Sequence, residues 1–519
     1  MIRANDDFDV EWEHPEDAER SWLRDATHSP GPEVPLAHSM MASFRGATGG
    51  GPSLLINGYA YSPAKAPRFP ELSDEEYAGR SGSQAWFELC LPRAESLVET
   101  VRGRDYASMT APELASLQPT VAEESAAISL ETFRTMGRMS GEFEALSAFC
   151  VEHFGERAGL ALELTRGAPN ETTAAAEALD RLSGRARDLP EVASAIASGR
   201  FDDLEAAAGG GEFLAELDSV LERYGWRSPS WEALEQPTMA EQPRQALQLI
   251  AKYLANPDGG PLRARARSAE AAVAALERSL AELDGEAGAR LQELVEVGKG
   301  YNAARESRAH YQLLSVGVMR PPVLALGRAM VEAGMLGEVD DVFYLTMEEL
   351  QNAVAGEFAG AGEQASKVRA NYAHWRTLQA PTFLGAPLPP MPREMAGPMV
   401  EMFGRSVPQG PDARVVHGIE GSAGVAEGVA RVLKSLDEAE RLGTGEVLVC
   451  VSTAPPWTAL FGIASAVVTD AGGVMSHTAL VAREFAIPCV VSTGDGTRRI
   501  ADGARVRVDG EAGTVTILD

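Results

Sequence analysis

Long apolar runs, clustered cysteines and an excess of basic charge are all missing from this chain of 519 residues. No run reaches the ~18 consecutive apolar residues that a membrane span needs, and the polar start, residues 1–7, lacks the apolar segment of a secretory leader. The cysteines lie far apart without a CxxC pair, which excludes a disulfide framework and favours a reducing compartment. We therefore expect a soluble cytoplasmic protein that does not interact with membranes.

The charge balance restricts the class of partner. With 75 acidic and 46 basic residues, the formal net charge is −29. Such a surface repels phosphate backbones, so we expect no nucleic-acid partner, although a small anion could still bind in a local basic pocket. Hydrophobic residues make up 45% of the chain, which is enough for large cores, and the length suggests two to four domains.

The first 380 residues are predicted to form a mainly helical domain. Sequences typical of capping boxes start at Ser73, Thr110 and Thr346, and residues 11–24 also look helical. The longest helical signal, Leu262 to about Gly317, carries an apolar stripe in three- and four-residue steps. A coiled coil is the alternative, but the stripe covers only about three heptads, which favours a packed internal helix.

A proline-rich segment separates this helical region from the rest of the chain. Eight of the 31 prolines fall between Pro381 and Pro411. Such a segment cannot be helical and is locally stiff, as suits a spacer between domains that move. We assign residues 381–415 as a hinge linker.

Beyond the linker the pattern becomes strand-like, which predicts a compact α/β domain over residues 416–519. Short β-branched runs alternate there with helical segments, and no repeat of 20–50 residues is visible in the chain. The expected strands are residues 428–433, 446–451, 466–469, 488–491, 505–509 and 514–517. The predicted fold class is α + α/β, with the large helical domain first.

One stretch of this second domain is suited to chemistry. A buried strand ends at Asp470, Gly472 and Gly473 allow a tight turn, and a helix begins at about Ser476, so His477 lies at a helix N-terminus. The free amides and the helix dipole favour an anion there, and a neutral imidazole nitrogen can attack phosphorus. By this local pattern alone, His477 could equally be a surface residue after an ordinary turn.

The wider motif decides between these interpretations. Gly-Gly, two residues, Ser-His-Thr-Ala, then Val-Ala-Arg-Glu and Ile-Pro closely resembles the phosphohistidine signature of the PEP-utilising enzyme family, and residues 421–428 and 453–461 resemble two further family segments. The resemblance implies that residues 416–519 form a swivelling β/β/α domain in which His477 carries a phosphoryl group. It also implies supporting residues for the phosphate or the histidine loop, which are Gly472, Gly473, Ser476, Thr478, Thr453 and Arg483. Helix geometry places Arg483 roughly 240° around from His477, so a structural salt bridge is an equally good interpretation of it.

The helical region shows a weaker resemblance to the acceptor-binding region of rifampin phosphotransferases and their relatives. It rests on residues 12–41, 304–306 and 340–345. We therefore name acceptor-site candidates, which are Arg305, Glu306, His310 and His38. Glu306 and the two histidines are candidates for the general base, and the sequence does not choose between them. A solvated helix face remains the alternative for Arg305 and Glu306, and no metal ligand is predicted.

The departures from the family pattern shape the functional hypothesis. In those relatives an ATP-grasp domain precedes the helical region, and no Gly-rich phosphate loop is found elsewhere in this chain. We expect the carrier and acceptor subunit of a split phosphotransferase that binds no cofactor itself. A separate ATP-grasp subunit with ATP and Mg²⁺ would phosphorylate His477, a split arrangement that phenylphosphate synthase resembles. A small phenolic or apolar hydroxyl compound would accept the group. The alternatives are a phosphohistidine carrier or regulatory module without acceptor chemistry, and a silent scaffold for an ATP-grasp partner.

Overall fold

The computed structural model describes residues 8–49, 51–64, 68–155, 159–231, 233–257, 259–387, 400, 404–405 and 407–518. The helical region contains α1 (Pro35–Met40), α2 (Ala42–Ala47), α3 (Asp74–Tyr77), α4 (Gly82–Ala85), α5 (Leu91–Arg102), α6 (Ala111–Phe133), α7 (Met136–Phe154), α8 (Leu160–Leu164), α9 (Glu171–Arg187), α10 (Pro190–Ala197), α11 (Gly210–Tyr224), α12 (Pro243–Ala255), α13 (Pro261–Ala281), α14 (Gly285–Gly317), α15 (Arg320–Glu332), α16 (Met347–Val354) and α17 (Ala361–Trp375). Shorter helical turns are η1 (Pro15–Glu19), η2 (Trp86–Cys90), η3 (Tyr106–Ser108), η4 (Phe201–Asp203) and η5 (Val339–Tyr344).

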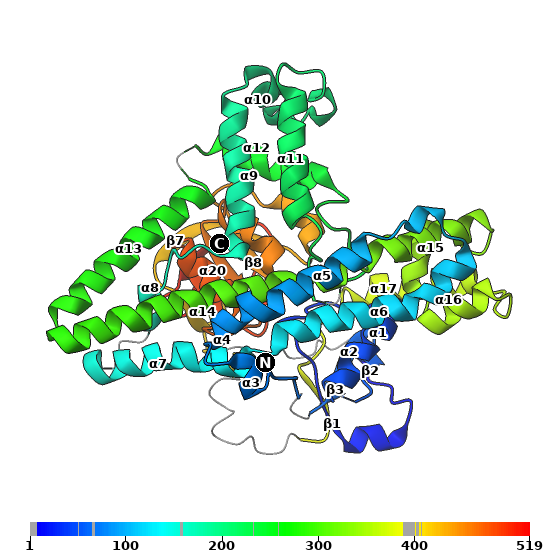
Figure 1. The fold of residues 1–519 in the computed structure, drawn as a ribbon, viewed down its shortest axis with the longest axis horizontal. Helices are drawn as coiled ribbons and strands as arrows, with labels where there is room; N and C mark the ends of the chain where they lie inside the picture. The colour runs from blue at the N-terminus through cyan, green and yellow to red at the C-terminus, as the bar shows by residue number, and fades with distance from the viewer. Residues whose placement is uncertain are drawn as a thin grey trace.

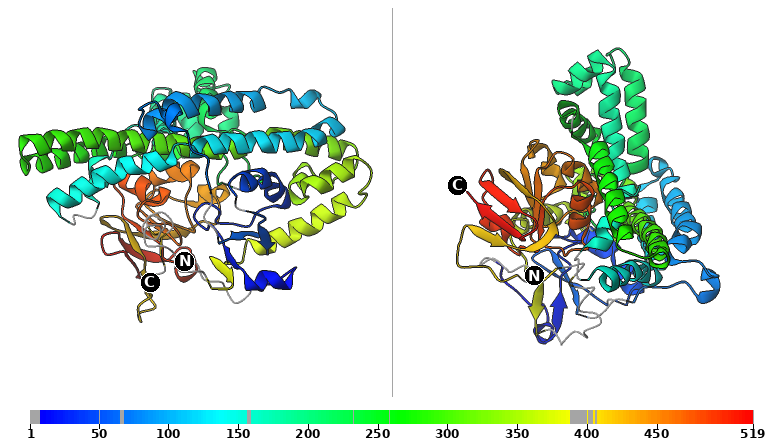
Figure 2. Two further views of the ribbon diagram at one scale, coloured as in Figure 1. Left: turned by 60° about the horizontal axis from the view of Figure 1, so that its bottom comes forward. Right: turned by 90° about the vertical axis from the view of Figure 1, so that its left-hand side faces the viewer.

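The long helices form a layer against which the other parts of the described chain pack. Helices α6, α7, α13 and α14 run across the molecule, and α9 to α12 rise from them as an arm (Figure 1). The C-terminal sheet region packs beneath this layer and beside the arm (Figure 2). The predicted fold class, a large helical region followed by a sheet region, is confirmed.

The helix boundaries follow the predicted caps. Capping boxes start α3 at Ser73, α6 at Thr110 and α16 at Thr346, so these predictions are confirmed. The segment predicted as one helical signal from Leu262 to Gly317 is instead two helices, α13 and α14. The Asp284 carboxylate accepts the backbone N–H groups of Glu286 and Ala287 and so starts a new helix.

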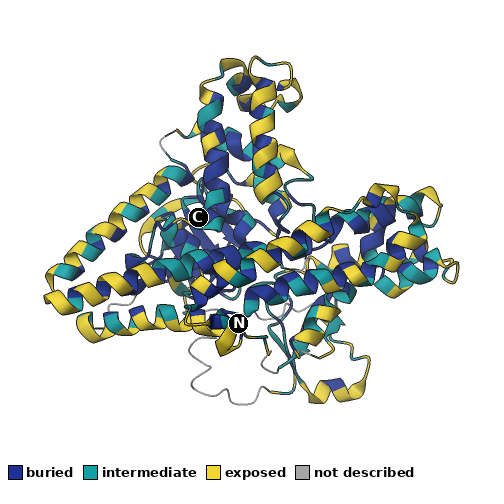
Figure 3. Ribbon diagram, viewed as in Figure 1, coloured by how far each residue is buried: buried dark blue, intermediate teal, exposed yellow. Residues whose placement is uncertain are grey.

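The apolar stripe of α13 and α14 is mainly a packing face. Leu291, Leu294 and Val295 are buried in one cluster with Leu146 of α7, which confirms the packed helix over the coiled coil. Two residues of the stripe do not follow this face: Val273 is 58% exposed and Val297 is 36% exposed, and the buried residues near Val273 are Ala272, Ala275 and Ser279. Among the described helices, the stretch Gly285–Glu332 is long and apolar enough to span a membrane, yet 72% of its apolar window is buried inside the protein. This burial matches the dark central part of the layer in Figure 3.

A small sheet corrects two predictions near the ends of the helical region. Its order is β2 (Leu54–Ile56), β3 (Tyr59–Pro63), β1 (Ser21–Leu23) and β4 (Phe383–Gly385). Residues 11–24 were expected to be helical but contain η1 and then β1, because Trp22 is buried in the core of this sheet and donates to the Asp17 carbonyl at 2.8 Å. The predicted spacer also begins within this sheet, since β4 pairs with β1.

The described ends of the predicted linker are attached to different parts of the molecule. Ser21 donates to the Pro387 carbonyl at 3.0 Å, which holds the first end against the small sheet. At the other end the backbone N–H of Arg405 donates to Ser492 Oγ at 3.1 Å, which ties it to the sheet region. Most of the segment between them, residues 388–399, 401–403 and 406, lies outside the described residues.

The C-terminal region is built on one mixed sheet. Its strand order is β5 (Val415–His417), β12 (Thr514–Ile517), β11 (Arg505–Asp509), β7 (Val425–Val432), β8 (Val447–Cys450), β9 (Ala466–Thr469), β10 (Cys489–Val491) and β6 (Ile419–Ser422). Strands β7 to β10 pair in parallel, and the outer pairs are antiparallel. Only Gly418 separates β5 from β6, which stand at the two ends of this order, so the sheet curls until its ends meet. The six predicted strands correspond to β7 to β12, whereas β5 and β6 were missed.

Short helices connect these strands: η6 (Leu436–Arg441), η7 (Pro455–Trp457), α19 (Thr458–Phe461), α20 (His477–Glu484) and α21 (Gly496–Arg499). The segment after Ser435 is the 3₁₀ helix η6, whose N-cap makes no side-chain hydrogen bond. Helices α19 and α20 share a buried core with the arm, in which Phe213 and Ile250 pack with Phe461 and Phe485. The Tyr253 hydroxyl also donates to the Ala459 carbonyl at 2.6 Å. The sheet region is therefore docked on the arm through an apolar interface.

Candidate active site

The loop before α20 requires glycine and a helix cap. Gly472 has a φ of +99°, and a Cβ there would lie 2.9 Å from Ser476 Oγ, so a side chain at this position would strain the turn. Ser476 is the N-cap of α20, and its Oγ accepts the backbone N–H of Ala479 at 3.4 Å. His477 is consequently the first residue of α20, where the helix dipole favours an anion.

The other predicted supporting residues act on the shape of this loop. Thr478 Oγ1 lies 2.9 Å from Thr453 Oγ1, which joins α20 to the segment after β8. Arg483 Nη1 donates to the Val474 carbonyl at 2.6 Å, so its contact is with the loop backbone rather than with a carboxylate. The interpretation of Arg483 as a salt-bridge residue is therefore replaced by a backbone contact, because the loop curls back over the helix.

The helical region and the sheet region meet at the His477 ring. Its Nε2 lies 3.5 Å from Thr458 Oγ1 of α19, and its Nδ1 lies 3.9 Å from Glu306 Oε2 of α14. The side chain is only 13% exposed. The Glu306 carboxylate in turn accepts a hydrogen bond from Thr172 Oγ1 at 2.5 Å, and Arg305 Nη2 donates to the Met475 carbonyl at 3.1 Å. The structure thus brings Arg305 and Glu306 to the histidine loop, where the alternative of a solvated helix face does not hold.

The electrostatics favour a neutral imidazole. Burial lowers the pKa of His477 to about 4, which the Glu306 carboxylate opposes and the positive charges of Arg305, Arg227 and His28 reinforce. At neutral pH the ring therefore keeps a free lone pair, which a nucleophile needs. The same positive charges would attract a phosphoryl dianion on the ring.

The two other candidates for the general base are placed differently. His310 is buried on α14 one turn beyond Glu306, and burial, with the charges of Arg227 and Arg223, lowers its pKa well below the usual value. His38 lies on α1, where its Nδ1 is 3.2 Å from Glu33 Oε2. Its Nε2 lies 3.3 Å from Ser53 Oγ, so both ring nitrogens contact residues of the N-terminal segment.

Two residues near the ring were missed from the sequence. Arg227 follows α11 and is only 6% exposed, and its Nε donates to the Tyr224 carbonyl at 3.0 Å. His28 lies in an N-terminal loop, with its Nδ1 2.6 Å from Asp25 Oδ2 and its ring 5.0 Å from that of Trp231. Neither belongs to a sequence motif, so only the folding of distant segments onto α20 identifies them.

A small, mostly apolar pocket with room for little more than water lies between the arm and the sheet region. Thr458, whose hydroxyl faces His477 Nε2, is one of its polar residues, together with Thr172, Tyr224 and Arg227. The remaining walls are mostly apolar and come from both regions: Ala175, Ala176, Leu179, Val220, Leu221, Gly225, Met239, Pro455, Pro456 and Ala459. The pocket shares Thr458 with the His477 site, but in this docked arrangement it is too small for an organic molecule.

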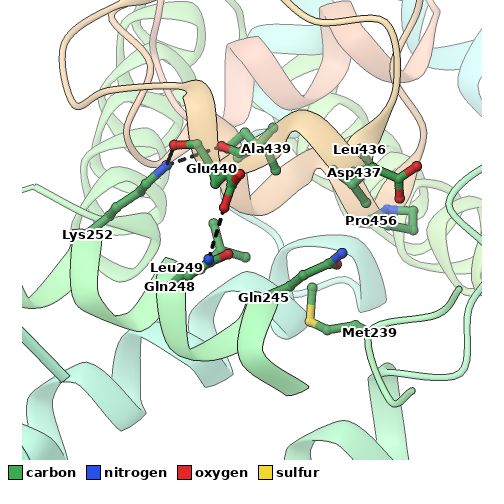
Figure 4. A pocket seen from close by; sticks show the side chains of 11 residues that line it. Met239, Gln245, Gln248, Leu249, Lys252, Leu436, Asp437, Ala439, Glu440 and Pro456 are labelled. Atoms are coloured by element: carbon green, nitrogen blue, oxygen red, sulfur yellow. Dashed lines mark hydrogen bonds between the residues drawn. The ribbon is translucent and has the colours of Figure 1, made fainter. Parts of the chain in front are cut away.

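A second small pocket lies between α12 and η6 (Figure 4). Lys252 lines this pocket, and its Nζ donates to the carbonyls of Ala439, Glu440 and Leu442 at 3.1, 3.1 and 2.6 Å. Gln248 Nε2 donates to Glu440 Oε2 at 3.2 Å. These bonds fasten the sheet region to the arm, so this pocket belongs to the docking interface and not to the histidine site.

Comparison with known families identifies the two regions. Residues 442–513 match the family described as PEP-utilising enzyme, mobile domain, and residues 125–306 match the rifampicin phosphotransferase fourth domain. His477 lies within the first match, and Glu306 is the last residue of the second. The chain therefore contains the mobile domain of PEP-utilising enzymes, and the resemblance indicated by the histidine motif is confirmed.

The similar full-length proteins agree with this class. The chain is 31% identical to a rifampicin phosphotransferase of Streptomyces sviceus over 82% of the chain and 49% of that protein. It is 29% identical to chondramide synthase cmdD of Chondromyces crocatus over 99% of the chain and 14% of the synthase. It is also 29% identical to the uncharacterized phosphotransferase YvkC of Bacillus subtilis over 61% of the chain and 38% of that protein. The chain spans about half or less of the length of these curated relatives.

Proposed function

We propose that this protein is a phosphotransferase in which His477 carries a phosphoryl group from a nucleotide donor to a small hydroxyl acceptor. The observation that carries the proposal is the neutral, largely buried His477 ring, which lies between Glu306 and Thr458, a residue of the apolar pocket. The phosphotransferase names of similar proteins support the same reaction class.

The two ring nitrogens have different tasks in this proposal. Nδ1 faces Glu306, and a carboxylate on that side favours the tautomer with the proton on Nδ1. Nε2 then keeps the lone pair and faces Thr458 at the pocket. We assign Nε2 as the atom that is phosphorylated: its lone pair forms the N–P bond while the donor's leaving group departs with its own electron pair.

The second transfer reverses this step toward the acceptor. The acceptor oxygen forms a bond to phosphorus, the Nε2–P bond breaks, and its electron pair returns to the imidazole. The acceptor hydroxyl loses its proton to a general base. Of the three predicted candidates we assign Glu306, because its side chain lies beside the reacting ring and accepts a hydrogen bond from Thr172, a pocket residue whose hydroxyl can pass the acceptor's proton to it.

The pocket suggests the acceptor class. Its largely apolar walls suit a phenol or another small apolar alcohol, which would enter when the two regions move apart, because the docked pocket has room for little more than water. A carrier or regulatory module without acceptor chemistry would have no use for an apolar pocket that shares Thr458 with the His477 site. This geometry favours the acceptor-binding enzyme over the carrier and scaffold alternatives.

The donor side of the proposal requires movement. In the docked arrangement His477 faces the helical region, and in-line transfer needs reacting atoms within about 3–3.5 Å at each site. We propose that the part of the predicted linker between β4 and β5 acts as the hinge that carries the sheet region between a donor site and this acceptor site. A cytoplasmic ATP-grasp subunit would supply ATP, release AMP and phosphate, and hold the Mg²⁺. The described residues offer no cluster of three or more His, Cys, Asp or Glu for a metal ion.

Labelling with β-³²P-ATP tests the proposal. With an ATP-grasp partner the chain should acquire an acid-labile, base-stable label, and His477→Asn should acquire none while remaining folded. The control is His153→Asn, on the far helix α7. Undiminished labelling of His477→Asn would show that this ring is not the carrier, and labelling without a partner would refute the split arrangement.

A further inference from the structure

Arg227 is a buried cation without a full set of partners. Only 6% of the residue is exposed, and Nη1 has no hydrogen-bond partner among the described residues. Its Nε is occupied by the Tyr224 carbonyl. Burying a guanidinium is costly unless its donors are satisfied, so an unpaired Nη1 in a pocket wall indicates a position for an anionic ligand.

Two neighbouring groups share this condition. His310 Nδ1 and Glu171 Oε2 are also buried and have no partner within the described part of the chain. The three residues lie within electrostatic range of one another, since Arg227 lowers the pKa of His310 and Glu171 counteracts the lowering of the Arg227 pKa by burial. Unsatisfied buried polar atoms occur elsewhere in the described part of the chain too, but among them Arg227 Nη1 is the one whose residue lines the pocket that contains Thr458.

Arg227 is also on the reacting side of His477. It lines the same pocket as Thr458, whose Oγ1 lies 3.5 Å from Nε2. Arg305 approaches the histidine loop from α14, where it donates to the Met475 carbonyl. The two guanidinium groups therefore bring positive charge to the ring from separate segments of the helical region.

We propose that Arg227 forms a phosphoryl-binding site at the acceptor side of His477. Its ligand class is a phosphoryl dianion, which can be attached to Nε2, attached to the phosphorylated acceptor, or free as inorganic phosphate. As the Nε2–P bond breaks and the acceptor O–P bond forms, Nη1 donates to an equatorial phosphoryl oxygen and neutralises its charge. The catalytic part of this inference rests on the proposed function, whereas binding of free phosphate does not.

The first experiment measures inorganic phosphate binding to the intact chain by calorimetry at neutral pH and low salt. A net charge of −29 repels phosphate in general, so measurable affinity requires a specific site. We expect Arg227→Gln to weaken binding about tenfold or more and Arg227→Lys to weaken it less, because lysine keeps the charge but loses the planar fork. Arg244→Gln is the matched control, because Arg244 is an exposed arginine of the same arm that pairs with Asp202.

Equal phosphate affinity in wild type and folded Arg227→Gln would overturn the proposal. If Arg227→Gln does not fold, Arg227→Lys decides in its place, and unchanged affinity in that folded variant would equally overturn it. His477→Ala separates this inference from the proposed function: phosphate binding that persists in His477→Ala and is lost in Arg227→Gln supports the anion site even if His477 is never phosphorylated.

A second experiment distinguishes the sources of the phosphoryl group. Phosphoramidate is used to phosphorylate histidine chemically, and ³¹P NMR follows the signal and lifetime of the phosphohistidine. A changed signal or lifetime in Arg227→Gln indicates that Arg227 contacts the group while it is still on Nε2. A loss of free-phosphate affinity with an unchanged phosphohistidine indicates a site for the phosphorylated product. The absence of both effects would refute the site.

Discussion

Docking of the sheet region should depend on pH through two residues at opposite ends of α20. His477 faces Glu306, and Glu484 Oε2 accepts the backbone N–H of Gly167 at 2.7 Å. Burial lowers the pKa of His477 from 6.5 to about 4 and raises the pKa of Glu484 from 4.5 to about 7. Undocking returns both side chains to water, so each pKa differs between the docked and undocked states.

The two residues change the docking free energy with pH in opposite directions. Between about pH 4 and 6.5 the docked state holds fewer protons on His477, so this residue weakens docking as the pH falls. Between about pH 4.5 and 7 the docked state holds more protons on Glu484, so this residue weakens docking as the pH rises. Each pKa difference corresponds to about 3 kcal/mol of docking free energy. Because the two slopes against pH are opposite, the docking free energy of the unaltered protein changes little with pH over this range.

Substituting one of the two residues should expose the pH dependence of docking that the other residue causes. In Glu484→Gln, docking should weaken as the pH falls from about 7 to 4.5, and in His477→Asn it should weaken as the pH rises over that range. Fluorescence transfer between dyes on Val273→Cys and Glu427→Cys measures docking, because both positions are exposed and the native cysteines are buried. Glu296→Gln, on the exposed face of α14, is the control. Identical pH profiles in all variants, or slopes of the reverse sign, would refute the reasoning.

Three further changes test other parts of the site. Glu306→Gln should slow transfer from phosphohistidine to the acceptor by about 10²–10⁴-fold in single-turnover measurements while sparing labelling by the donor; equal loss of both steps would exclude Glu306 as the base. Lys252→Ala removes three hydrogen bonds between α12 and the η6 segment and should weaken docking by about 1–3 kcal/mol in the fluorescence assay. The control Lys299→Ala should leave docking unchanged. Gly472→Ala should cost about 1–3 kcal/mol of stability in thermal unfolding because of its positive φ, whereas an unchanged Tm would show that the turn tolerates a side chain.

The local features of this protein follow from the sequence alone. Capping boxes at Ser73, Thr110 and Thr346 and the strands β7 to β12 were predicted because caps and side-chain periodicity act within a few residues. The position of His477 at the start of α20 was predicted for the same reason, since Gly472 and Ser476 are its close neighbours in the chain. The PEP-utilising mobile domain was recognised from that motif.

Only the tertiary structure decided which distant groups surround that histidine. Glu306 and Arg227 come from segments more than a hundred residues away, and helical periodicity did not indicate that the Arg305–Glu306 pair would face the ring. Strand β1 was taken for helix because its pairing with β4, some 360 residues later, is invisible to local patterns. A short segment encodes its own backbone shape through near neighbours, but a site that several segments build depends on how their buried faces pack, and that is a property of the whole chain.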